Sequence, residues 1–180
     1  MSIITKIKPS LWFTGNAEEA VHFYTTVFPS SSITHVSRYT AAGKHEHKME
    51  VGSVMSMTFT LHDQAFYAIN GPPAFQFSQA ISFTVLCEDQ KEVDHYWEKL
   101  GDGGELGGCG WLKDRFGVSW RVVPRTLEDM QENGDEEQRA RVAEAKSRMG
   151  KLDIKKLEKA FLGIRKAGHR RSQYQISLGS

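Results

Sequence analysis

The spacing of apolar residues changes within residues 3–69, and the change predicts a strand, then a helix, then three more strands. Residues 3–13 are rich in β-branched and aromatic side chains and predict the first strand. Apolar side chains then recur every three or four residues, at Ala17, Ala20, Val21, Tyr24 and Phe28. Asn16 precedes this helix as a candidate N-cap, and Pro29 ends it. Strands follow at 32–39, 54–61 and 65–69, with a polar loop over residues 40–52.

The same order of elements begins again after Pro72 and Pro73. A strand is predicted over residues 80–87, and Asp89 is a candidate cap for the helix that follows. Gly101 ends this helix, whose apolar face consists of Val93, Tyr96, Trp97 and Leu100. Three short strands are predicted at 105–106, 111–113 and 118–123. Two copies of a strand–helix–three-strand unit, about 70 residues apart, indicate an internal repeat.

The pattern changes beyond Pro124. Helical segments are predicted at 126–131, at 136–149 and from Asp153 onward. The last has a narrow apolar stripe that we expect to pack on the sheets or on a partner: Ile154, Leu157, Phe161 and Ile164. Residues 168–180 show no pattern, and we expect them to be disordered. The predicted units are therefore a two-module domain at 1–124 (modules at about 4–72 and 78–124), a helical extension at 125–167 and a tail at 168–180.

Composition narrows the functional classes. The chain has 180 residues, of which 39% are hydrophobic, enough to bury a core without a metal or a disulfide. Lys and Arg total 23 and Asp and Glu total 22, which argues against a dedicated nucleic-acid-binding or membrane-surface protein. Cys87 and Cys109 form no CxxC pair, which excludes a disulfide scaffold. Because the sequence shows no signal peptide and no apolar stretch of about 18 residues, we expect a cytoplasmic protein.

Two segments resemble a known family. Residues 11–20 read LWFTGNAEEA and, with Phe23, Tyr24, Phe28 and Pro29, are similar to the first strand and helix of the vicinal oxygen chelate (glyoxalase-like) superfamily. Residues 109–120, CGWLKDRFGVSW, resemble its PhnB-like branch, in the set named 3-demethylubiquinone methyltransferase-like. The resemblance covers about residues 4–124. It implies an α+β fold in which two βαβββ modules form curved mixed sheets around a cavity, with C-terminal helices added.

Metal-dependent members of the superfamily place one His, Gln or Glu ligand on each of four strands. The resemblance puts these positions at Pro9, Tyr67, Ser82 and Arg121 here. Proline has no donor side chain, serine is a poor ligand and an arginine repels a cation, so we expect no metal and no cofactor. A guanidinium in an apolar cavity needs a partner, which makes Arg121 a candidate ligand for an anionic or strongly polar small molecule. The alternative is that Arg121 pairs with Asp114 or with a Glu on a neighbouring strand.

The other candidate site residues each have a plain structural alternative. Trp111 and Trp120 either line a pocket for a flat ligand or pack a sealed core. Cys109 is a candidate nucleophile, or a small side chain that fits where the backbone is crowded. Asn70 offers an amide at the rim of the site, or it simply forms a turn. Residues 45–47, His-Glu-His, have the composition of a metal site, although a solvated loop is the simpler interpretation.

Three functional hypotheses follow. The first is a metal-free protein that binds a small organic molecule, anionic or aromatic. The second is the methyl transfer that the family name suggests, which the lack of a Gly-rich loop after the first strand argues against. The third is a non-enzymatic protein whose basic residues His169, Arg170 and Arg171 bind an acidic partner. Members of the family commonly form dimers, so the resemblance also implies a homodimer, and we expect no membrane or nucleic-acid partner.

Overall fold

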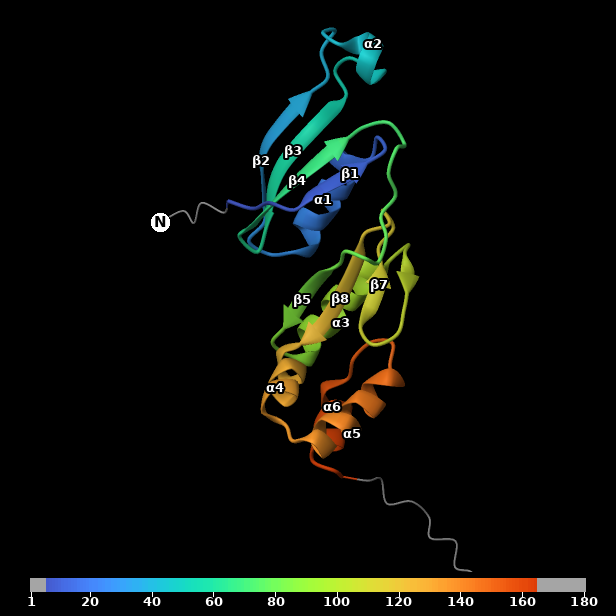
Figure 1. Cartoon of the computed structure of the whole chain (residues 1–180). Helices are drawn as coiled ribbons and strands as arrows, with labels where there is room; N and C mark the ends of the chain where they lie inside the picture. The colour runs from blue at the N-terminus through green and yellow to red at the C-terminus, as the bar shows by residue number, and fades with distance from the viewer. Residues whose placement is uncertain (1–5, 165–180) are drawn as a thin grey trace, which may run out of the picture.

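The computed structural model describes residues 6–164, which form two modules and a helical extension arranged one after another (Figure 1). The first module contains β1 (Ser10–Phe13), α1 (Ala17–Val27), β2 (Ser32–Arg38), α2 (Lys44–His47), β3 (Val54–Leu61) and β4 (Gln64–Asn70). Its strands form sheet A in the order β1-β4-β3-β2. The β1–β4 pair is parallel and the other pairs are antiparallel.

The second module repeats this connectivity. It contains β5 (Phe83–Cys87), α3 (Gln90–Gly101), β6 (Glu105–Leu106), β7 (Trp111–Lys113) and β8 (Ser119–Pro124). These strands form sheet B in the order β5-β8-β7-β6, again with one parallel pair, β5–β8. The predicted α+β fold with two βαβββ modules is confirmed.

One helix covers one face of each sheet, α1 on sheet A and α3 on sheet B. Strand residues alternate between the two faces, so the side chains under the helices are buried while their neighbours point to the opposite side. We call that opposite side the open face of each sheet. The buried residues of both modules form one continuous core, in which Tyr24 of α1 packs on Trp120 of β8 and Phe28 stacks on Tyr96 of α3. The two modules therefore fold against each other.

The largest differences from the prediction are two strand starts and one loop. Within the described residues the first strand begins at Ser10, and residues 6–9, which were predicted to belong to it, are not part of a strand. Pro9 lacks an N–H and so contributes only its carbonyl, which accepts a hydrogen bond from the Tyr67 N–H at 2.9 Å. The strand predicted from residue 80 begins at Phe83, and the predicted loop over residues 40–52 contains the one-turn helix α2.

The start of α1 is capped from a distant strand. Asn16 occupies the N-cap position but its side chain makes no capping hydrogen bond, so the prediction that it caps the helix is wrong. Instead, Asn70 Oδ1 accepts hydrogen bonds from the backbone N–H groups of Gly15 (3.2 Å) and Ala17 (2.9 Å). The Asn70 amide also donates to the Val54 carbonyl at 2.9 Å. By contrast, Asp89 caps α3 as predicted.

The extension consists of α4 (Arg125–Asn133), α5 (Glu136–Ser147) and α6 (Ile154–Phe161). Its apolar side chains form a second small core, which includes Val123 of β8 and in which Leu157 of α6 is fully buried. Ile164 of the α6 stripe is exposed, while Leu157 and Phe161 pack mainly against α4 and α5 and not against the sheets. The reason is that Leu127, Val142 and Leu152 from the rest of the extension already provide an apolar surface beside it. The predicted tail at 168–180, including the basic residues 169–171, lies outside the described residues.

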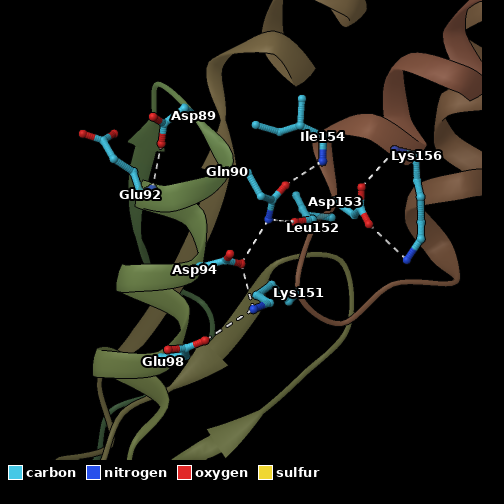
Figure 2. Close-up of polar contacts among 10 residues, drawn as sticks. All are labelled: Asp89, Gln90, Glu92, Asp94, Glu98, Lys151, Leu152, Asp153, Ile154 and Lys156. Carbon is cyan, nitrogen blue, oxygen red and sulfur yellow. Dashed lines mark hydrogen bonds and ion pairs between the residues drawn. The ribbon is translucent and has the colours of Figure 1, made fainter.

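A polar contact network joins the extension to α3 (Figure 2). The Gln90 side chain donates to the Leu152 carbonyl at 3.1 Å and accepts from the Ile154 N–H at 2.9 Å. Lys151 forms ion pairs with Asp94 (2.7 Å) and Glu98 (3.5 Å) on the next turns of the same helix. Three residues of α3 thus hold the segment that leads into α6.

In residues 6–164, none of the helices has the length and apolar composition needed to span a membrane.

Candidate functional site

The registers of the two sheets place Tyr67 and Arg121 at equivalent positions. Tyr67 of β4 lies opposite Ser10 in the parallel pair of sheet A. Arg121 of β8 lies opposite Thr84 in the parallel pair of sheet B. Because the modules repeat, each pair is the counterpart of the other. Tyr67 lies three residues before the end of β4 at Asn70, and Arg121 lies three residues before the end of β8 at Pro124.

Two of the positions inferred from the resemblance, Pro9 and Ser82, do not belong to these register pairs. The residue beside Tyr67 is Ser10 and not Pro9, and the residue beside Arg121 is Thr84 and not Ser82. Ser82 lies two residues earlier, just before β5, where it lines a cavity between the modules. Neither Ser10 nor Thr84 restores a metal site, because a hydroxyl is as poor a ligand as the residues that were expected.

The four side chains at these positions do not fit a divalent cation. Ser10, Tyr67 and Thr84 offer neutral hydroxyls, and Arg121 carries a positive charge. A divalent ion needs several strong nitrogen or oxygen donors that converge on one point. Across the described residues, no three His, Cys, Asp or Glu side chains are grouped so that they could hold a metal ion. We derive no metal-dependent chemistry for this face.

Arg121 lies on the open face of sheet B, supported by an aromatic ring. Trp111 of β7 is its cross-strand neighbour, and the guanidinium carbon stands 5.3 Å from the centre of the indole. The Nε atom of Arg121 is buried and has no hydrogen-bond partner within residues 6–164. In the same part of the chain no carboxylate forms an ion pair with this guanidinium. A half-buried arginine with an unsatisfied donor is a candidate for binding an acceptor.

Asp114, the proposed alternative partner of Arg121, is already satisfied by four neutral donors. Its Oδ2 accepts hydrogen bonds from the Tyr24 hydroxyl (2.7 Å) and the Trp120 indole (2.8 Å). Its Oδ1 accepts from the backbone N–H groups of Phe116 (2.9 Å) and Val118 (3.0 Å). Burial raises the pKa of Asp114, and the hydrogen bonds oppose that rise. Asp114 thus joins α1 to the β7–β8 turn and does not pair with Arg121.

Two other candidates, Asn70 and Cys109, make contacts that stabilise the fold. The amide of Asn70 is occupied by the three backbone partners described above, in a fully buried position. Cys109 adopts a left-handed backbone conformation with φ +60°, where its N–H donates to the Met149 carbonyl at 2.7 Å. Its thiol lies 3.5 Å from the Lys146 carbonyl, which is an acceptor and not a base that could generate a thiolate. Cys109 therefore contacts the extension.

The His45–His47 segment forms the short helix α2 and not a loop. His47 Nδ1 accepts a hydrogen bond from the Met49 N–H at 3.0 Å, and its ring packs 4.5 Å from that of Tyr39. His45 and Glu46 are exposed. These contacts give the segment a local structural role.

Trp120 and Trp111 take different positions. Trp120 is buried in the shared core and is also among the residues that line a cavity of about 590 Å³ between the modules. Trp111 is half-buried on the open face beneath Arg121. The predicted residues Ser82 and Trp120 line this cavity, whereas Trp111 and Arg121 lie on the open face, so these predicted site residues divide between two places.

Sequence reasoning missed two residues of that cavity. His62, at the turn between β3 and β4, lies 2.8 Å from the hydroxyl of Tyr96 on α3 through its Nε2 atom. The two residues are 34 positions apart, and only the packing of the modules brings them together. The lone signal in the sequence was a histidine at the tip of a two-residue hairpin turn, where φ is positive at both His62 and Asp63.

Comparison with known proteins agrees with this fold. The family described as 3-demethylubiquinone-9 3-methyltransferase matches residues 5–123. This chain belongs to that family. One similar solved structure is described as a putative 3-demethylubiquinone-9 3-methyltransferase, PhnB protein, from Bacillus cereus. It is 37% identical to this chain, and the match covers 67% of this chain and 99% of the other chain with a TM-score of 0.60. Protein PA1353 from Pseudomonas aeruginosa is 20% identical over 67% of this chain and 97% of its own, with a TM-score of 0.53. No curated protein matches this chain.

The family match covers both modules and includes Tyr67, Thr84, Trp111 and Arg121. The extension lies outside it, since the family model ends one residue before Pro124. The extension nevertheless contacts the second module closely, through Cys109, Gly110 and α3.

Proposed function

We propose that this family member binds a small organic anion on the open face of sheet B, without a metal. The observation that carries the proposal is the buried Arg121 Nε with no partner, on a guanidinium that packs over the Trp111 ring. A desolvated guanidinium gains most from a carboxylate or a similar planar acceptor, which it binds through two parallel hydrogen bonds. The neighbouring Thr84 hydroxyl adds a further donor beside it.

We also infer that the chain is a member of the vicinal oxygen chelate superfamily in which an arginine replaces a metal ligand. The repeated βαβββ modules and the equivalence of Tyr67 and Arg121 support this inference. In such a site the positive charge of the arginine takes the part that a cation plays in attracting an oxygen-rich ligand.

Substitution of Arg121 tests the proposal. Native mass spectrometry of the purified protein is expected to detect a co-purifying organic acid. Arg121→Met, which keeps the length of the side chain but removes its charge, should weaken binding of that acid at least 10-fold, because a charged hydrogen-bonding partner is lost. Arg121→Lys is the matched control and should retain part of the affinity. Equal affinity in the wild-type and Arg121→Met proteins would refute the proposal.

Methyl transfer, which the family name suggests, is the second candidate. S-adenosylmethionine-dependent enzymes of the doubly wound type bind the cofactor at a Gly-rich turn within a parallel sheet. Here each sheet has a single parallel pair, and the β1–α1 connection is residues 14–16, Thr-Gly-Asn. We therefore expect no heat of binding when S-adenosylmethionine is titrated into the protein. A micromolar affinity would favour methyl transfer over our proposal.

We propose in addition that the protein forms a homodimer. Strands β1 and β5 each end their sheet, and a free strand edge exposes backbone groups that another strand can pair with. In a twofold dimer, β1 of each copy can pair with β5 of the other copy, so the backbone groups at both edges are hydrogen-bonded.

A further inference from the structure

The cavity between the modules has the size and walls of a small-molecule site. Its volume of about 590 Å³ falls within the range of roughly 300–1,000 Å³ that is common for ligand pockets. Aromatic side chains from both modules form its walls, and they pack in a continuous series, with Phe28 5.1 Å from Tyr96 and 5.4 Å from Trp120. Phe83 continues the series, 5.4 Å from Trp120. Flat faces of this kind suit an aromatic ligand.

A pair of polar groups lies at one side of these rings. His62 Nε2 and the Tyr96 hydroxyl are 2.8 Å apart, and both residues line the cavity. Each group can act as donor or acceptor, since the histidine has two tautomers and the hydroxyl can rotate. Burial raises the pKa of Tyr96 to about 12, so its hydroxyl keeps its proton at neutral pH. The pair can therefore share a hydrogen bond with a third hydroxyl group.

The charges around the cavity disfavour an anion. Glu88 and Glu92 both line it, and Arg125 is the cationic residue of the wall. Glu88 is paired with Arg125. Glu92 accepts a hydrogen bond from the Glu88 N–H at 2.8 Å, and no cationic side chain of residues 6–164 pairs with it. The wall thus carries one uncompensated negative charge, the opposite of the Arg121 face.

We propose that this cavity binds an uncharged, flat aromatic molecule with one hydroxyl group. Its ring would lie against Phe28, Phe83 and Trp120, and its hydroxyl would join the His62–Tyr96 pair. The cavity borders the Arg121 face, because Thr84 lines the cavity and is also the register partner of Arg121. The two proposals rest on different polar groups, the His62–Tyr96 pair and Arg121, so each can fail without the other.

The test uses two probes that share a ring system and differ in charge, 2-naphthol and 2-naphthoate. Calorimetry at pH 7 on the full-length protein should show 2-naphthol binding that weakens about 3- to 10-fold in His62→Asn, the change expected for one lost hydrogen bond. Asparagine tolerates the left-handed conformation at this turn position, so the hairpin is kept. Asp63→Asn is the matched control, because Asp63 belongs to the same turn but does not line the cavity, and it should bind like wild type.

Two further measurements separate this site from the Arg121 face. Arg121→Met should leave 2-naphthol binding unchanged, and Glu92→Gln should strengthen 2-naphthoate binding in the cavity by removing a negative charge. By NMR, 2-naphthol should shift the indole N–H signal of Trp120 and not that of Trp111. The Trp111 signal is assigned as the one that is lost in the Trp111→Phe variant. The inference is overturned by no binding at millimolar 2-naphthol, by equal affinity in wild type and His62→Asn, or by a shift confined to Trp111.

Discussion

Asp114 illustrates how a single residue joins the two modules. It is a buried carboxylate whose four hydrogen-bond donors are all neutral, and one of them, the Tyr24 hydroxyl, comes from the other module. Burial of an acceptor without such partners is costly, so the module interface depends on these donors. Burial also raises the pKa of Tyr24 well above its ordinary value, so this hydroxyl remains protonated and continues to donate.

We predict that Tyr24→Phe lowers the free energy of unfolding by about 1–3 kcal/mol, the usual cost of leaving a buried polar group without a partner. Chemical denaturation followed by tryptophan fluorescence measures this change. Tyr67→Phe is the control, since Tyr67 is half-buried and its hydroxyl makes no hydrogen bond in the described part of the chain. It should change stability by less than about 0.5 kcal/mol. Equal effects of the two substitutions would contradict the role given to Asp114.

At the scale of elements, α3 contacts two parts of the molecule. One face packs on sheet B, and its polar side holds the extension through Gln90, Asp94 and Glu98 (Figure 2). The Lys151 ammonium, together with the Gln90 amide, lowers the pKa of Asp94 below its ordinary value of 3.8. A carboxyl whose folded-state pKa is lowered stabilises the fold above its unfolded pKa and loses that contribution as the pH falls.

Acid is therefore expected to weaken the docking of the extension. Between about pH 5 and pH 3, the protection factors of the amide protons in residues 151–157, which correct for the pH dependence of intrinsic exchange, should fall more than those of β3. The effect is small, under about 1 kcal/mol, because both partners are partly exposed and solvent screens them. Lys151→Met should remove most of this pH dependence, and Lys155→Met, on the neighbouring surface of α6, should not. Identical pH profiles in the wild-type and Lys151→Met proteins would contradict the assignment.

At the scale of the whole molecule, the arrangement of the modules leaves β1 and β5 as sheet edges. We predict that light scattering finds a dimer at micromolar concentration, and that dilution increases hydrogen exchange at the β5 amides. A monomer whose mass is independent of concentration would refute this expectation. It would leave the ligand proposals unaffected, because each of them rests on side chains of one chain.

Element order and much of the packing could be predicted from the sequence. Helical spacing in α1 and α3 and alternation in β3 gave elements close to those observed, and repetition of the unit gave the fold class. The exact strand starts could not be predicted, because a strand begins at the residue where it first pairs with its neighbouring strand. Ser10 and Thr84 thus became the neighbours of Tyr67 and Arg121 only through the β4 and β8 registers.

The candidate site was proposed from residue types, and the partners of those residues could not be predicted. The lack of metal ligands and the charge of Arg121 are properties of residue types, and these are visible in the sequence alone. The identity of the groups around them depends on contacts between distant segments: Tyr24 with Asp114, His62 with Tyr96, and Asn70 with the start of α1. Local patterning carries the period of a helix or strand, whereas such contacts arise only when the modules pack and exclude water.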